Sequence, residues 1–200
     1  MEDDAYLTIS RQSEGFYKEK GSKFLAFTYP VNNEEEVKEH ISELKKKYYD
    51  ARHHCYAFII GSDAVFFRAG DDGEPTNSAG NPILGQIRSK ELTNVLIVVV
   101  RYFGGTKLGV SGLINAYKTA AADALENAEI QKEFVTKKGY LLFQYPQMND
   151  AMKLVKDFDL NIVEQNFTMD CKLTLEVRKS ICNQLVAKVN EIYGLSLELE

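Results

Sequence analysis

Basic and glycine residues concentrate in one stretch of the chain, between Arg88 and Lys118. Its cations are Arg88, Lys90, Arg101, Lys107 and Lys118, its glycines are Gly104, Gly105, Gly109 and Gly112, and its one carboxylate is Glu91. Glycine lets backbone N–H groups face a ligand, and lysine and arginine add positive charge. Because the chain as a whole is acidic, this local excess predicts a surface for an anion, and phosphate is the anion we expect.

The segment GGTKLGVS, residues 104–111, has the context of a phosphate-binding loop, since it follows a predicted strand and precedes a helix expected to begin near Ser111. Val110 stands where a Walker A lysine is required, which argues against a nucleoside triphosphatase. We predict that the anion lies at the positive end of the helix. The residues expected to contact it are Arg101, Gly104, Gly105, Lys107, Gly109 and Ser111, with Arg88 and Lys118 extending the basic surface. The alternative is that the glycines only make a tight turn.

A second polar segment, DDGEPTNSAGNP, begins at Asp71. Asp71, Asp72 and Glu74 are candidates for general acids, metal ligands or partners of the nearby cations. A calcium loop needs a closing bidentate carboxylate, which this segment lacks, so we expect no metal site. We expect the three carboxylates and Ser78 to support the loop, either by fixing the glycine segment or by capping the turn before Pro75. A catalytic carboxylate pair is the alternative.

The run His53, His54 and Cys55 raises the possibility of a zinc site or a thiol nucleophile. Neighbouring side chains of an extended segment point to opposite faces, so the three cannot converge on one ion. We expect Cys55 to be a buried core residue, and a histidine to join Arg52 at the edge of the basic surface. Tyr102 and Phe103 are either stacking surfaces for bases or core residues.

The first two thirds of the chain alternate predicted strands and helices. We expect strands at 6–11, 15–18, 23–31, 55–60, 65–69 and 93–101, and helices at 34–49, 83–88 and 112–127. Within the last of these strands, Val95 to Val100 is apolar without alternation. That pattern is typical of a central strand covered on both faces.

The remainder of the chain changes pattern. It predicts a strand at 134–145, a helix at 146–158, strands at 161–167 and 168–177, a helix at 179–192 and a strand at 195–199. The order βαββαβ is that of the ferredoxin-like arrangement. We therefore predict a two-domain α+β protein, with domains at 1–130 and 134–200 and a junction at residues 129–133.

Composition limits the function classes. A net charge of −5 argues against a generally basic nucleic-acid coat, so any nucleic-acid contact must come from a patch. Three widely spaced cysteines indicate a reducing compartment. The N-terminus is acidic where a signal peptide is basic, and the longest apolar run is far below the roughly 20 residues of a membrane span. We expect a cytoplasmic protein with no membrane partner and no cofactor.

Four blocks of the sequence resemble the Impact family, whose bacterial members include the YigZ-type proteins. The blocks are GSKFLA at residues 21–26, ARHHCYAF at 51–58, DDGEPTNSAGNPIL at 71–84 and VVVRYFGGTKLGVSGLINAY at 98–117. They occur in the family's order over most of residues 15–120. Asn77 departs from the pattern, because many members have glycine there.

The resemblance implies a ribosomal protein S5 domain 2-like N-terminal domain followed by a ferredoxin-like C-terminal domain. Elongation factor G places similar folds side by side, and eukaryotic Impact proteins regulate translation initiation by competing for an activator of a stress kinase. The resemblance implies no reaction. We expect a binding or regulatory protein linked to translation, contacting RNA or a ribosome-associated partner.

The alternative is an enzyme acting on a phosphorylated or peptide substrate with Asp71, Asp72 or Glu74 and with Arg101 and Lys107. A binding protein should expose its cations on an open face. An enzyme should hold carboxylates and base together in a pocket.

Overall fold

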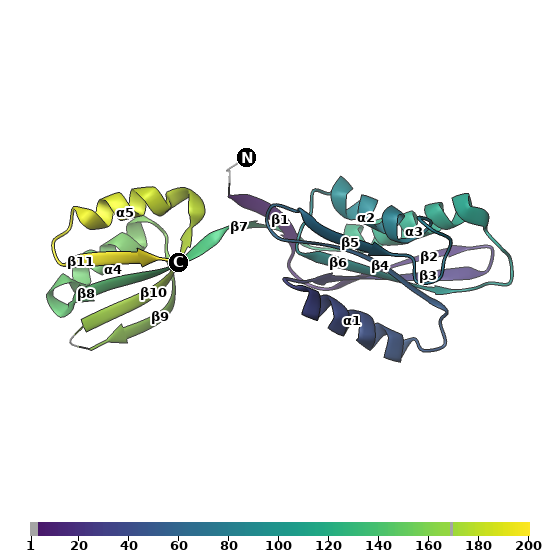
Figure 1. The fold of residues 1–200 in the computed structure, drawn as a ribbon, viewed down its shortest axis with the longest axis horizontal. Coiled ribbons are helices and arrows are strands. Elements are labelled where there is room, and N and C mark those ends of the chain that lie inside the picture. The colour runs from purple at the N-terminus through teal and green to yellow at the C-terminus, as the bar shows by residue number, and fades with distance from the viewer. Residues whose placement is uncertain (1–3, 169) are drawn as a thin grey trace. The chain divides into compact units, whose positions relative to one another are not determined.

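The computed structural model describes residues 4–168 and 170–200, which divide into two compact units of mixed α and β structure (Figure 1). One unit comprises residues 6–133, and the other comprises residues 134–200 together with residues 4 and 5. The N-terminal residues join the second unit because the Asp4 carboxylate accepts hydrogen bonds from the Ser180 N–H at 2.9 Å and from Arg178 Nη2 at 3.2 Å. These residues were expected in the first domain.

The first unit contains a five-stranded antiparallel sheet. Its strands lie in the order β2 (Ser13–Glu19), β3 (Ser22–Pro30), β6 (Val95–Tyr102), β4 (His53–Ile60) and β5 (Phe66–Gly70). Strand β6 is central, as its uninterrupted apolar sequence predicted, and pairs with β3 on one side and β4 on the other.

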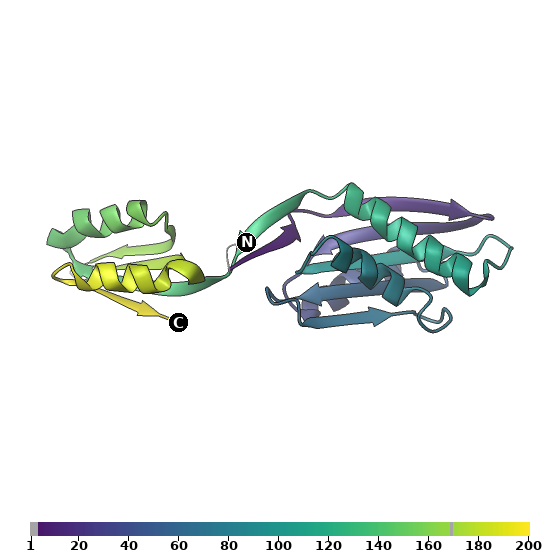
Figure 2. The same cartoon turned by 90° about the horizontal axis from the view of Figure 1, so that it is seen from above.

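Helices cover both faces of this sheet (Figures 1 and 2). Helix α1 (Glu34–Lys47) lies on one face, and α2 (Gly80–Ser89) and α3 (Gly109–Glu126) lie on the other. Alternate residues of β6 therefore enter two cores: Leu96, Val98 and Val100 belong to the core on the α1 side, and Val95, Ile97 and Val99 belong to the core under α2 and α3. The prediction that this strand is covered on both faces is confirmed.

A two-stranded sheet joins β1 (Ala5–Ile9) to β7 (Ile130–Phe134). The segment 129–133 was expected to form the junction between the domains, and the structure shows that most of it is a strand, which the sequence analysis did not predict. Its sequence, EIQKE, is short and mostly charged or polar, so it carries little of the apolar alternation from which strands are inferred.

The second unit has the element order β8 (Thr136–Gln144), α4 (Met148–Asp157), β9 (Asn161–Phe167), β10 (Asp170–Arg178), α5 (Cys182–Asn190) and β11 (Leu195–Leu199). Its antiparallel sheet has the order β11-β8-β10-β9. Each helix therefore connects two strands between which a third strand is inserted. Leu154 of α4 and Leu185 of α5 pack into a core with Leu141 and Leu173 of the central strands.

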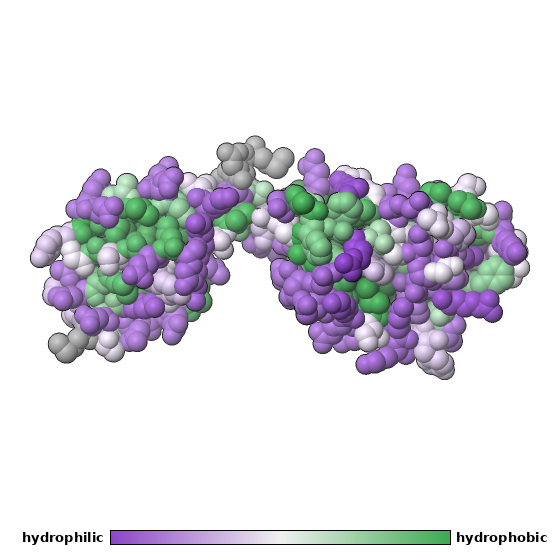
Figure 3. All heavy atoms as spheres, in the orientation of Figure 1, coloured by the Kyte–Doolittle hydropathy of each residue, from purple (hydrophilic) through white to green (hydrophobic). Residues whose placement is uncertain are grey.

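The edge strand β5 exposes apolar side chains, and Figure 3 shows such residues gathered near its start. Val65, Phe66 and Phe67 are 71%, 44% and 47% exposed. The strand has only five residues, and it includes the charged Arg68. Short length and charge both limit pairing of an edge strand with another chain.

Two glycines bring the β2–β3 turn against the glycine loop. A Cβ atom on Gly104 would lie 1.9 Å from the carbonyl carbon of Gly21, so only glycine permits this approach. The Gly104 N–H also donates to Ser22 Oγ at 3.1 Å. The loop is thus anchored to the hairpin at the backbone level.

Among the described residues, no helix is long and apolar enough to cross a membrane.

We predict that Gly104→Ala lowers the free energy of unfolding by at least about 1–3 kcal/mol, because a methyl group would force two backbones apart. Gly85→Ala is the matched control: Gly85 lies inside α2 with nothing within 4 Å of its added Cβ, so this change should stabilise by about 0.5–1 kcal/mol. Urea unfolding of both variants measures the difference. Equal stabilities would contradict the backbone contact.

Candidate anion-binding site

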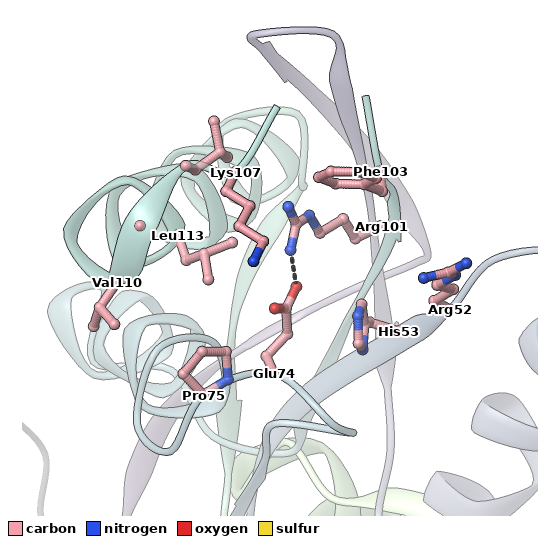
Figure 4. Close-up of a pocket in the computed structure, with 11 residues that line it drawn as sticks. Arg52, His53, Glu74, Pro75, Arg101, Phe103, Lys107, Val110 and Leu113 are labelled. Carbon is pink, nitrogen blue, oxygen red and sulfur yellow. Dashed lines mark hydrogen bonds and ion pairs between the residues drawn. The ribbon is translucent and has the colours of Figure 1, made fainter. Parts of the chain in front are cut away.

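A cavity of about 460 Å³ opens at the start of α3 (Figure 4). Three cations line it, Arg52, Arg101 and Lys107, together with one carboxylate, Glu74. Apolar side chains, including Phe103, Val110 and Leu113, form much of the remaining wall. In Figure 4 the Lys107 amine and the Arg101 guanidinium both point toward the space beside the Glu74 carboxylate. The site is a basic pocket with apolar walls.

A buried ion pair forms its floor. Arg101 Nη1 donates to Glu74 Oε1 at 2.5 Å, and the two side chains are only 7% and 4% exposed. The Tyr117 hydroxyl donates to the same oxygen at 2.7 Å. Arg101 Nε is buried and has no hydrogen-bond partner among the described residues. Within the described residues the guanidinium thus uses only part of its hydrogen-bonding capacity, through Nη1.

The sequence predicted a solvent-accessible Arg101, and the structure corrects this. Arg101 lies near the end of the central strand β6, where both faces are covered. Its guanidinium lies 5.5 Å from the ring centre of Phe24 and 5.7 Å from that of Phe103. Packing between aromatic rings and pairing with Glu74 together allow the charge to be buried.

Helix α3 begins at Gly109, earlier than the start expected near Ser111. Within the described chain no side chain caps this end, and the first turn contains no acidic residue. The first N–H groups of the helix thus carry positive partial charge that no carboxylate of the first turn offsets. Gly109 and Val110 line the cavity, whereas Gly104, Gly105 and Ser111 are outside its lining. Gly105 has a φ of +90° and makes the turn.

The other predicted acidic residues hold the loop in place. Asp71 Oδ1 accepts from the N–H groups of Ala79 and Gly80 at 3.0 and 2.8 Å, which caps the start of α2. Asp71 Oδ2 accepts from the Asn77 N–H at 2.8 Å. Ser78 Oγ donates to the Pro75 carbonyl at 2.6 Å. Asn77 has a φ of +63°, a left-handed conformation that glycine and asparagine adopt more readily than other residues.

Asp72 points away from the cavity toward α1 and β4. Its carboxylate accepts from Lys45 Nζ at 3.1 Å and from the His54 N–H at 2.7 Å. Burial alone would raise the pKa of Asp72, but the His54 N–H and the Lys45 ammonium outweigh it and the pKa is lowered. Asp71 and Asp72 therefore form no ion pair with Arg101 or Lys107, and Glu74 is the acidic residue that pairs with Arg101.

The five cations predicted as one basic surface are not all together. Arg88 lies over the Phe67 ring of β5, with its Cζ 4.3 Å from the ring centre. Lys118 is exposed on α3, nine residues after Gly109, or about 13 Å along the helix at about 1.5 Å per residue. Neither residue lines the cavity. The sequence analysis grouped Arg88 and Lys118 with the cavity residues because they are close in sequence. Closeness in sequence does not show in which direction a side chain leaves its helix or strand.

The structure adds residues that the sequence indicated weakly or missed. Arg52 and His53 line the cavity, in keeping with the expected edge position of Arg52. Phe103 lines it and is 49% exposed, so it is not a core residue. Tyr117 was missed, although Gly109, Leu113 and Tyr117 recur at the four-residue spacing that puts them on one helical face.

Cys55 is fully buried beside this site, the core position expected from sequence. Its Sγ lies 2.9 Å from the Asp71 carbonyl oxygen and 3.3 Å from the Tyr117 hydroxyl. Burial strongly raises the pKa of the Cys55 thiol, and burial likewise raises the pKa of Tyr117. Both groups therefore stay protonated at neutral pH, and Cys55 is not a thiolate nucleophile.

Comparisons with known proteins place these residues in a family context. A family described as the Impact N-terminal domain matches residues 20–125. The chain is 37% identical over 123 residues to the Bacillus subtilis protein IMPACT family member YvyE, which covers 62% of this chain and 57% of that protein. It is 29% identical over 182 residues to IMPACT family member YigZ of Escherichia coli, covering 90% and 89%.

A solved structure described as that of a hypothetical protein superposes with a TM-score of 0.72 at 26% identity. The match covers 97% of this chain and 96% of that one. Every residue that lines the cavity lies within the Impact match at 20–125.

We predict that Glu74→Gln lowers the free energy of unfolding by about 3 kcal/mol, because it leaves the buried Arg101 charge without its counter-ion. The exposed pair Arg68–Glu34, at 3.1 Å, provides the control, and Arg68→Ala should lower stability by less than about 1 kcal/mol. Chemical denaturation of the two variants tests this. If Glu74→Gln destabilised no more than Arg68→Ala, the ion pair would not be a structural anchor.

We also predict that Cys55 in the folded protein resists alkylation by iodoacetamide at about pH 8, because its thiol is buried and its pKa is raised. Mass spectrometry of peptides containing Cys55 should show modification only after denaturation. Rapid alkylation of Cys55 in the native protein would contradict the protonated, inaccessible thiol.

Proposed function

Because this chain belongs to the Impact family, we propose that it is a binding or regulatory protein linked to translation that contacts RNA through the pocket at the start of α3. The observation that carries the proposal is the convergence of three cations and an uncapped helix end on one cavity. Each of these features favours an anion, and phosphate is the anion that RNA presents.

The fold supports the same proposal by analogy. We assign the first unit, residues 6–133, to a ribosomal protein S5 domain 2-like domain and residues 134–200 to a ferredoxin-like domain. The sheet order β11-β8-β10-β9 and the inserted strand in each βαβ connection support the second assignment. Elongation factor G combines similar folds, which is a fold-level analogy only. A role in translation places the protein in the cytoplasm, where three free cysteines are expected to stay reduced.

Charge distribution favours RNA over a protein partner. The whole chain has a net charge of −5, whereas the cavity lining carries three cations against one carboxylate. An acidic protein that concentrates positive charge in one apolar-walled pocket is suited to few, localised phosphate contacts. A ribosome-associated protein partner is the outcome to consider if RNA does not bind.

An enzyme acting on a phosphorylated or peptide substrate is the second candidate. One observation favours it: Glu74 lies in the cavity beside Lys107 and Arg101. The proposed acid–base pair is nevertheless incomplete, because Asp71 and Asp72 point elsewhere and Glu74 already accepts hydrogen bonds from Arg101 and Tyr117. Binding is therefore the function that the geometry supports best.

We predict that Lys107→Ala weakens binding to single-stranded RNA severalfold and flattens the log–log salt dependence by about 0.7, the contribution of one phosphate contact. Lys118→Ala, an exposed lysine on the same helix outside the cavity, should leave both quantities unchanged. Arg101 is unsuitable for this test because its substitution would remove a buried ion pair. Fluorescence anisotropy from about 50 to 200 mM salt measures both variants. If the wild-type protein bound no RNA near 50 mM salt, a protein partner would replace RNA in the proposal.

A further inference from the structure

Building on the proposed function, we infer that the pocket is specific for a terminal phosphate, at the end of an RNA strand or on a mononucleotide, with the adjoining base stacked on Phe103. The inference rests on three independent features of the described residues: the charge of the cavity, the access to Arg101, and a second, aromatic cavity that shares Phe103.

The charge of the lining matches a dianion. Arg52, Arg101 and Lys107 outnumber Glu74 by two positive charges, and the uncapped end of α3 adds partial positive charge. A phosphate monoester carries about −1.5 to −2 at pH 7, whereas each internal phosphate of an RNA strand carries about −1. A terminal phosphate is therefore the better electrostatic complement.

The access to Arg101 also favours a terminal phosphate. Its side chain is only 7% exposed, lies between Phe24 and Phe103 and lines the cavity, so a ligand would meet the guanidinium through the cavity. An internal phosphate is linked to nucleotides on both sides, so two segments of the RNA strand would have to leave the cavity. A terminal phosphate needs one.

The base has a surface next to the phosphate position. Phe103 is 49% exposed and lines both the basic cavity and a second cavity of about 540 Å³. The second cavity also includes Phe16, Tyr48, Tyr102 and Lys23. Arg101 Cζ lies 5.7 Å from the Phe103 ring centre, so one nucleotide can contact both residues. Aromatic side chains are suitable stacking partners for bases of any type.

The test uses the full chain and short oligoribonucleotides of one sequence with a 5′-phosphate, a 3′-phosphate or no terminal phosphate. Anisotropy titrations should show one phosphorylated form binding at least about tenfold more tightly than the unphosphorylated strand, the difference being reduced severalfold by Lys107→Ala. Competition with a nucleoside monophosphate and with inorganic phosphate distinguishes the sources of the phosphate, and the nucleotide should compete better.

Phe103→Ala tests the stacking and should weaken binding about tenfold. Its matched control is Phe67→Ala, which removes an aromatic side chain of similar exposure, 47%, outside both cavities and should have no effect. Melting temperatures of the variants should show that all remain folded.

The possible failures are distinguishable. Equal affinity for all three strand ends would overturn the terminal-phosphate inference and leave RNA binding intact. Equal effects of Phe103→Ala and Phe67→Ala would overturn stacking on Phe103. If no strand bound, the proposed function itself would fail, and the inference with it.

Discussion

The arrangement of the pocket depends on the buried ion pair between Glu74 and Arg101. It joins a loop that follows β5 to the central strand β6, and the Tyr117 hydroxyl extends it to α3. Burying two charges is unfavourable unless further hydrogen bonds satisfy them, so such a pair is weak evidence for stability in itself. Its effect is positional: three elements far apart in sequence are held at one oxygen atom of Glu74.

The pair also determines how the charge and the hydrogen bonds of Arg101 are satisfied. Glu74 engages Nη1 of Arg101 and offsets one positive charge, while Nε stays without a partner in the described chain. Lys107, by contrast, is exposed, and its long side chain lines the cavity wall. The site therefore combines a fixed guanidinium with an adjustable ammonium, and these cations differ in how they bind phosphate.

Local sequence patterns predicted much of the fold, but they could not predict which residues far apart in sequence contact each other. The bounds of β9 and β11 match the expected 161–167 and 195–199, and the central place of β6 follows from its unbroken apolar run. The partner of Arg101 was not predictable, because Glu74, Asp71 and Asp72 have the same charge and lie close together in sequence. Which of them faces the arginine depends on the turn at residues 71–77, including the left-handed Asp72, Gly73 and Asn77.

The glycines show that one sequence pattern can have two physical explanations, exposed backbone N–H groups or close backbone packing. Their clustering suggested that their backbone N–H groups are exposed to an anion. Of the glycines predicted to contact it, however, Gly109 lines the cavity and the others do not. Gly104 instead allows backbone contact with Gly21, and a Cβ on Gly15 would lie 2.2 Å from the backbone nitrogen of Ala124 in α3. Both contacts fix the β2–β3 hairpin, one against the loop before α3 and one against α3 itself. These glycines therefore act through close backbone packing, which holds the hairpin, the loop and α3 in fixed relative positions.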